Sequence, residues 1–110
     1  MTEKRGSDAV ATPLNVRAMR RHAVKAAGLM RSLGNPHRLL VLCVLSEGEI
    51  SVSELNRRIP LSQSALSQHL AVLRREKLVR TRRESQTIYY SVTDGPAMEI
   101  VRLLHTSFCG

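Results

Sequence analysis

Residues 61–92 have the sequence LSQSALSQHLAVLRREKLVRTRRESQTIYYSV, and this stretch decides the fold. Ser62 is a residue type that caps helix N-termini, and apolar residues then recur at helical spacing up to about residue 75. The leucines that share one side of this helix are Leu66, Leu70 and Leu73. The first half of the stretch therefore predicts an amphipathic helix over about residues 63–75.

The second half of the same stretch changes periodicity after Lys77. Residues 78–83 and 87–92 are rich in β-branched and aromatic side chains, which favour strands. Residues 84–86 between them are Glu-Ser-Gln and form the expected tip of a β-hairpin. A hairpin directly after a helix of this kind is typical of a wing.

A shorter capped helix precedes the helix at 63–75. Ser51 and Glu54 have the spacing of a capping box, and Ile59-Pro60 ends the segment that they begin. Only a tight turn fits between Pro60 and the next cap at Ser62. Two short capped helices joined by a minimal turn predict a helix-turn-helix.

Two longer helices are expected before this unit. Thr12-Pro13 is a cap followed by a proline and predicts the start of the first helix, which ends at Gly34-Asn35. Its apolar stripe consists of Val16, Met19, Ala23, Ala26, Met30 and Leu33. Asn35-Pro36 repeats the start signal and opens a second helix that stops at Gly48. Because residues 39–45, LLVLCVL, are apolar all round, this helix is expected at the buried centre of the domain.

A last helix is predicted after the hairpin, starting at residues 94–96, Asp-Gly-Pro. The residues expected to share its apolar face are Ala97, Ile100, Val101, Leu104 and Phe108. The predicted fold is mainly α with a β-hairpin wing, a winged helix-turn-helix in the order α-α-α-α-β-β-α. Residues 1–11 are expected to form a flexible tail, and residues 12–110 the DNA-binding and dimerisation domain.

Composition agrees with one small helical domain that binds a polyanion. The chain has 110 residues, 43% apolar and only 3% aromatic. Lys and Arg number 17 against 9 acids, giving a net charge of +8 and favouring nucleic acid over an anionic membrane. The apolar run from Leu39 to Leu45 is far too short to span a bilayer, and no signal-peptide segment begins the chain. A cytoplasmic location with reduced thiols is therefore expected.

The polar side of the helix at 63–75 is the predicted recognition surface. Short hydroxyls and amides let a helix enter the major groove, while arginines near its end and on the hairpin suit phosphates. The candidate DNA-binding residues are Gln63, Ser64, Ser67, Gln68, His69, Arg74, Arg75, Arg80, Arg82 and Arg83. The alternatives are an ordinary solvated helix face and a charged edge strand that blocks aggregation. Basic residues of the first helix, Arg17, Arg20, Arg21 and Lys25, are interpreted as a solvated face.

The SQSALSQHLAVLR core, with the arginine-rich hairpin and its Tyr-Tyr pair, resembles the ArsR family of winged-helix repressors. The likeness covers about residues 25–109. It implies a homodimer built from the first and last helices, a recognition helix at 62–75 and a wing at about 79–91. It also implies repression relieved by an inducer, and such a dimer is expected on an inverted-repeat operator in double-stranded DNA.

Many members of this family sense metals, but the metal-binding positions do not match here. Ser51 and Ser53 stand where one metal site has a Cys-x-Cys pair, and hydroxyls are poor ligands for soft metals. For a second type of site the chain offers only Asp94, Pro96 and a lone His105. His22, His37 and His69 are scattered, so neither a metal site nor any cofactor is predicted.

The two cysteines remain as candidate sensing residues. From the residues alone, Cys43 could be a small core residue and Cys109 incidental. Their placement in LCVLSEGEISVSEL and LLHTSFCG, however, resembles the ArsR-family branch of persulfide-responsive repressors and HlyU-like regulators. That resemblance implies redox sensing in which a persulfide or oxidant bridges Cys43 and Cys109 and relieves operator binding. Cys109 is the expected first nucleophile, because burial raises the pKa of a thiol such as Cys43.

Three other functions stay open at this point. The chain could be a metal-responsive or constitutive ArsR-type repressor whose cysteines are structural. A small thiol oxidoreductase is less favoured, since neither a Cys-x-x-Cys motif nor an activating base beside a cysteine is evident, so no enzyme is predicted. An RNA-binding or plasmid-maintenance protein could use the same basic surface, and specific binding to a palindromic duplex would separate the repressor from both.

Overall fold

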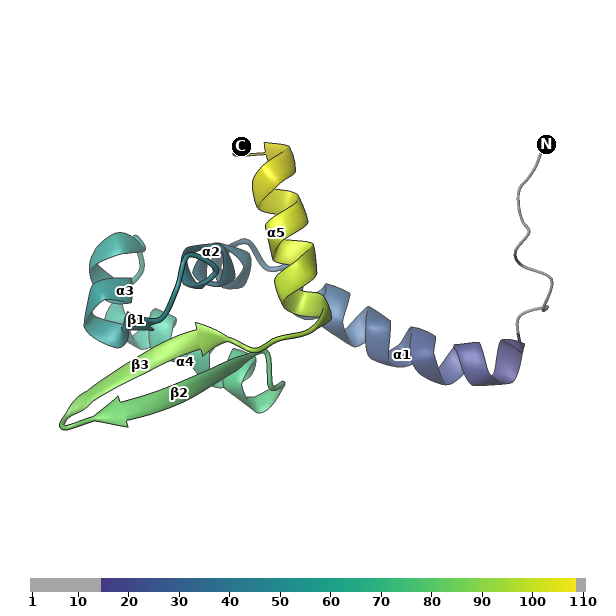
Figure 1. The fold of residues 1–110 in the computed structure, drawn as a ribbon, viewed down its shortest axis with the longest axis horizontal. Coiled ribbons are helices and arrows are strands. Elements are labelled where there is room, and N and C mark those ends of the chain that lie inside the picture. Colours follow the sequence, from purple (N-terminus) through teal and green to yellow (C-terminus); the bar gives the residue numbers. More distant parts are fainter. Residues whose placement is uncertain (1–14, 109–110) are drawn as a thin grey trace.

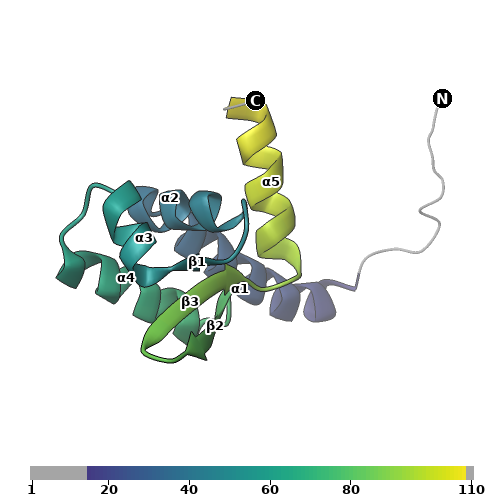
Figure 2. The ribbon, with the colours of Figure 1, turned by 60° about the vertical axis from the view of Figure 1, so that its left-hand side comes forward.

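The computed structural model describes residues 15–108, which form a mainly helical domain with a three-stranded antiparallel sheet (Figures 1 and 2). The elements in chain order are α1 (Val16–Leu33), α2 (Pro36–Leu45), β1 (Ile50–Ser51), α3 (Val52–Arg58), α4 (Gln63–Arg75), β2 (Val79–Glu84), β3 (Thr87–Val92) and α5 (Pro96–Phe108). The predicted winged helix-turn-helix is confirmed, with one strand added to the predicted order.

The helix starts are fixed by side-chain caps. Asn35 accepts hydrogen bonds from the backbone N–H groups of His37 and Arg38 at 3.0 Å each, as its position before Pro36 predicts. The described part of α1 begins instead with Asn15, whose side chain accepts from the Ala18 N–H at 3.2 Å. The predicted start at Thr12-Pro13 lies outside the described residues.

The helix-turn-helix is formed by α3 and α4, whose starts were both predicted. Ser51 accepts from the Glu54 N–H at 3.2 Å, and Ser62 accepts from the Ala65 N–H at 3.1 Å. The Glu54 carboxylate does not complete the predicted capping box, because it pairs with Arg57 one turn further on. The helix pair therefore depends on two serine caps and on its packing.

The hairpin of β2 and β3 forms the wing, and its register is fixed by the turn at Ser85. This residue has a φ of 56°, the left-handed conformation that a tight hairpin turn requires. The two-residue strand β1 was not predicted and pairs with β3 on the side away from β2, in the strand order β1-β3-β2. It aligns Ile50 with Tyr90 and Ser51 with Tyr89, which ties the start of α3 to the wing.

The core lies where α2, α3, α4, the sheet and α5 meet. Its fully buried side chains include Val41, Leu42, Leu45, Leu55, Leu66, Leu73 and Val101. The predicted place of α2 at the centre of the domain is confirmed by Val41, Leu42 and Leu45, although the Leu40 side chain is 40% exposed. The predicted apolar face of α5 is buried at Ala97 and Val101, whereas Phe108 beyond them is 82% exposed.

The first helix behaves differently from the others, because α1 extends away from the rest of the domain (Figure 1). Of its predicted apolar stripe, only Leu33 at the C-terminal end is buried. Val16, Met19 and Met30 are 77%, 42% and 58% exposed. A stripe with helical spacing is thus present, but no other part of residues 15–108 covers it.

Candidate nucleic-acid interface

The predicted recognition helix α4 separates its apolar and polar sides cleanly. Leu66, Leu70 and Leu73 are buried against the core. The predicted contact residues on the other side are exposed: Gln63, Ser64, Ser67 and Gln68. Two cations, Arg74 and Arg75, are exposed in the last turn of the helix. The surface is therefore small and polar at its start and cationic at its end.

This division has a chemical consequence. Serine hydroxyls and glutamine amides carry both hydrogen-bond donors and acceptors, and a glutamine can pair bidentately with adenine in the major groove. Short side chains also allow the helix backbone to approach the bases closely. Arginines at the far end suit phosphates, which position a protein on a duplex without reading its sequence.

His69 lies at the border of this surface. Its side chain is half-buried, and its ring centroid is 5.6 Å from that of His37 at the start of α2. Burial lowers the pKa of His69 below its usual range, and the nearby charges of Arg38 and His37 lower it further. His69 therefore packs between α2 and α4, apart from the fully exposed side chains with which the sequence analysis grouped it.

The wing carries its three predicted arginines in two environments. Arg80, Arg82 and Arg83 are all exposed on β2. The Arg82 guanidinium forms a two-pronged ion pair with Glu49, with Nη2 2.8 Å from Oε1 and Nε 3.0 Å from Oε2. It also lies 4.6 Å above the ring centroid of the cross-strand neighbour Tyr89. Arg82 is thus held in place and its charge is offset by a carboxylate.

Glu49 is the residue of this surface that the sequence analysis missed. It immediately precedes β1, and the pairing of β1 with β3 carries it across the sheet to the arginines of β2. The hydrogen bond from Arg82 lowers the pKa of Glu49 below its usual range. Only recognition of the two-residue strand β1 would have revealed the pair, because Glu49 and Arg82 are 33 residues apart.

Cys43 occupies a different part of the molecule, on α2 close to α5. Its side chain is half-buried and packs against the hydrophobic core, and its carbonyl accepts a hydrogen bond from the Ser46 hydroxyl at 2.6 Å. A cavity of about 290 Å³ opens beside the end of α2 and is lined by Ser46, Glu47, Arg102, His105 and Thr106. The second candidate sensing residue, Cys109, lies outside the described residues.

The described residues offer neither a cluster of metal ligands nor a membrane-spanning helix. Among residues 15–108, no three side chains of His, Cys, Asp or Glu lie close enough together to hold a metal ion. Ser51, which stands at one family metal position, uses its hydroxyl as the cap of α3. None of the described helices is long and apolar enough to cross a membrane.

Comparison with known proteins gives one consistent family. Residues 35–81 match the model of the bacterial regulatory proteins of the arsR family. The transcriptional activator HlyU of Vibrio cholerae is 45% identical over 97 residues, covering 88% of this chain and 90% of HlyU. The biofilm growth-associated repressor of Xylella fastidiosa is 43% identical over 91 residues, covering 83% of this chain and 80% of the repressor.

The fold comparison agrees with the sequence comparison. The structure of reduced HlyU from Vibrio cholerae superposes with a TM-score of 0.82 at 45% identity, covering 86% of this chain and 99% of HlyU. The similar proteins are regulators of transcription and not enzymes. This chain belongs to the ArsR family of winged-helix transcriptional regulators, in the branch that contains HlyU.

Proposed function

We propose that this chain is a homodimeric, sequence-specific repressor that binds an inverted-repeat operator and releases it when Cys43 and Cys109 become bridged. The observation that carries the DNA-binding part is the exposed polar face of α4, centred on Ser64, Ser67 and Gln68. The wing follows α4 in the chain and adds two exposed arginines, Arg80 and Arg83. Among the described residues, neither of them has a carboxylate within ion-pair distance.

The two parts of this surface have separate roles. Gln68 and Ser64 read base edges in the major groove, and the arginines of α4 and the wing bind the backbone on either side. Because Arg82 is paired with Glu49, it contributes less net charge than Arg83. Its main role is to hold the wing against the segment that leads into α3, through Glu49 and Tyr89.

The proposed dimer is supported by apolar surface that residues 15–108 leave exposed. Val16, Met19 and Met30 are exposed along α1, and Leu103 and Phe108 are 64% and 82% exposed on α5. Large exposed apolar patches on a soluble protein mark interaction sites. A second copy of the chain could pack its own α1 and α5 against α1 and α5 of the first copy. This contact would cover the exposed residues and place the two recognition helices on one face of a duplex.

The redox switch is supported by the position of Cys43 and by the family branch. Cys43 lies on α2, which contacts α5, and α5 carries part of the proposed dimer surface. A covalent link between Cys43 and Cys109 would thus join the centre of the domain to the dimer helix. The similar HlyU structure is that of the reduced protein, the state in which the proposed repressor would bind its operator.

The proposed reaction is a thiol–persulfide exchange followed by closure. The Cys109 thiolate attacks the outer sulfur of a hydropersulfide RSSH, forming Cys109–S–SH and releasing RS⁻. The Cys43 thiolate then attacks the sulfur bonded to Cys109, forming the disulfide and expelling HS⁻. Both thiols are oxidised, and the persulfide is reduced to RSH and hydrogen sulfide.

Operator selection followed by a binding assay tests this function. The reduced protein should enrich a palindromic duplex from a random pool and bind it as a dimer, and persulfide treatment should release it. Mass analysis of the Cys43 and Cys109 peptides should show the link in the released protein. A metal-responsive repressor would instead release the duplex with micromolar zinc while both thiols stay reduced. A repressor should also lower transcription from a promoter that overlaps the duplex, whereas an activator should raise it.

A further inference from the structure

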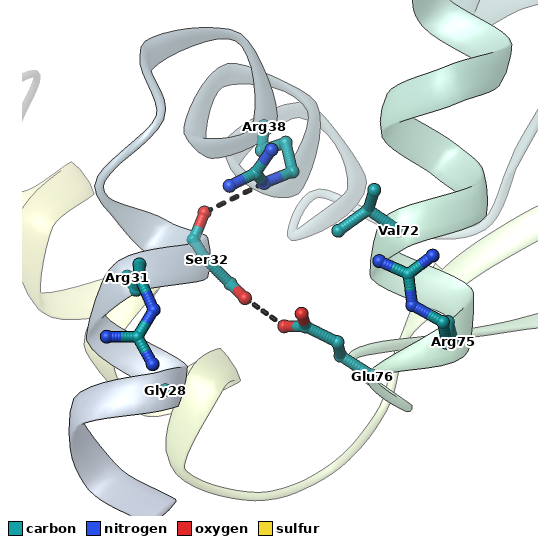
Figure 3. Close-up of a pocket in the computed structure, with 7 residues that line it drawn as sticks. All are labelled: Gly28, Arg31, Ser32, Arg38, Val72, Arg75 and Glu76. Carbon is teal, nitrogen blue, oxygen red and sulfur yellow. Dashed lines mark hydrogen bonds between the residues drawn. The ribbon is translucent and has the colours of Figure 1, made fainter. Parts of the chain in front are cut away.

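A second cationic site lies away from the polar face of α4. A cavity of about 350 Å³ opens where the C-terminal half of α1, the start of α2 and the end of α4 meet (Figure 3). It is lined by Gly28, Arg31, Ser32, Arg38, Val72, Arg75 and Glu76. Three helices thus contribute one arginine each to a single hollow.

Positive charge is in excess in this cavity. Its lining contains three guanidinium groups and one carboxylate, that of Glu76, which is engaged by the buried Ser32 hydroxyl. The Arg38 Nε donates to the Ser32 carbonyl at 3.1 Å, which leaves its two terminal nitrogens available in the cavity (Figure 3). Within residues 15–108, Arg31, Arg38 and Arg75 form no ion pair.

The cavity walls favour an anion with several oxygens. A guanidinium offers paired N–H donors whose spacing matches the oxygens of a phosphate group. The volume of about 350 Å³ leaves room for such a group, and Arg31 Nη2 lies beside Gly28, where a Cβ would be in ordinary van der Waals contact with it at 4.0 Å. The cavity thus combines forked donors from different directions with room for a tetrahedral group.

The position of the cavity indicates which molecule would supply such a phosphate group. Arg75 belongs to the last turn of α4, so the cavity continues the proposed DNA-binding surface beyond the end of the recognition helix. Gly28 follows Met19 by nine residues, which places it on the opposite side of α1. A partner protomer seated on the exposed stripe of α1 would therefore leave the cavity open.

We propose that this cavity binds a backbone phosphate of the DNA duplex, through Arg31, Arg38 and Arg75. The inference rests on the proposed DNA-binding function. It extends the DNA-binding surface from the recognition helix and the wing to α1 and α2. The same phosphate would contact the dimer helix and the recognition helix together. Its binding would then depend on how α1 and α4 are placed relative to each other.

The test compares Arg31→Gln with Arg21→Gln, a matched control on the same helix that removes the same charge outside the cavity. At about 0.2 M salt, Arg31→Gln should weaken specific and non-specific duplexes alike, by about threefold to tenfold, and lower the salt slope of the binding constant by about one. Arg21→Gln should keep the wild-type slope. Equal slopes for both variants and wild type would overturn the proposal, while a wild-type protein that binds no duplex would overturn the proposed function itself.

A second measurement locates the phosphate. Duplexes carrying a single neutral methylphosphonate are scanned along the operator backbone with wild type and with Arg31→Gln. One position should weaken wild type by about threefold or more and leave Arg31→Gln unaffected. The proposal is wrong if the two proteins give the same scan. It is also wrong if inorganic phosphate, at constant ionic strength, saturates the site at millimolar concentration and the neutral backbone positions have no effect, because the ligand is then a free anion.

Discussion

Ser32, near the C-terminal end of α1, donates its hydroxyl to the carboxylate of Glu76, the C-cap residue of α4. The Ser32 side chain is buried, and its carbonyl is held by Arg38 of α2. This pair joins the helix that carries the uncovered apolar stripe to the end of the recognition helix. A shift of α1 relative to the domain would break it, so the pair links the position of α1 to the orientation of α4.

Removing the Ser32 hydroxyl should destabilise the protein modestly. Ser32→Ala should lower the free energy of unfolding by about 0.5–1.5 kcal/mol, the usual contribution of one hydrogen bond, and urea denaturation measures it. Glu76→Gln keeps an acceptor oxygen and should lose less. A Ser32→Ala protein as stable as wild type would show that the bond contributes nothing to the link between α1 and α4.

Gln68 should determine sequence preference. Gln68→Ala should cost about 1–3 kcal/mol in binding to the selected operator and relax the preference at the base pair it reads, because a bidentate contact is lost. Non-specific affinity should be nearly unchanged. Binding to operators substituted at each base pair provides the measurement, and an unaltered preference would move the recognition surface away from this face of α4.

The two arginines Arg82 and Arg83 should respond differently to neutralisation. Arg83→Gln should weaken all duplexes alike and lower the salt slope by about one, as expected for one phosphate contact. Arg82→Gln should cost more, since it leaves the Glu49 carboxylate uncompensated near the DNA. Adding Glu49→Gln to Arg82→Gln should recover part of the loss in titrations at several salt concentrations. Recovery should be absent if Glu49 lies far from the bound duplex.

The half-buried His69 should make the protein sensitive to mild acid. Its pKa is lowered by burial, so the unfolded chain takes up the proton at higher pH than the folded one. The stability associated with neutral His69 is present above about pH 6.5, the ordinary histidine value, and is lost as the pH falls through the lowered pKa. His69→Gln should flatten this dependence in denaturation curves between pH 5 and 8. A ring that titrates at or above the ordinary value by NMR would refute the assignment.

Local signals account for the parts of the fold that were predicted. Asn35, Ser51 and Ser62 cap their helices as expected, because capping depends only on residues three positions away. The change from helical to alternating periodicity after Lys77 likewise located the hairpin. The exposed polar side of α4 likewise followed from the spacing of its buried leucines.

Long-range contacts account for what was missed. Strand β1 has two residues and exists only because it pairs with β3, some 40 residues later in the chain. The Glu49–Arg82 pair depends on that strand, and the arginine-lined cavity depends on three helices meeting. The exposure of Phe108 was also misjudged, because helical periodicity shows which face is apolar and not whether the same domain covers it.

The most direct test of the proposed switch measures operator affinity for wild type, Cys43→Ala and Cys109→Ala, before and after a persulfide donor. Reduced, all three should bind with similar affinity, since neither thiol belongs to the proposed DNA surface. After treatment, wild type should lose about 5- to 150-fold in affinity, the range of a coupling free energy of about 1–3 kcal/mol, while both variants stay bound. If either variant releases the operator as fully as wild type, bridging of Cys43 and Cys109 is not the switch.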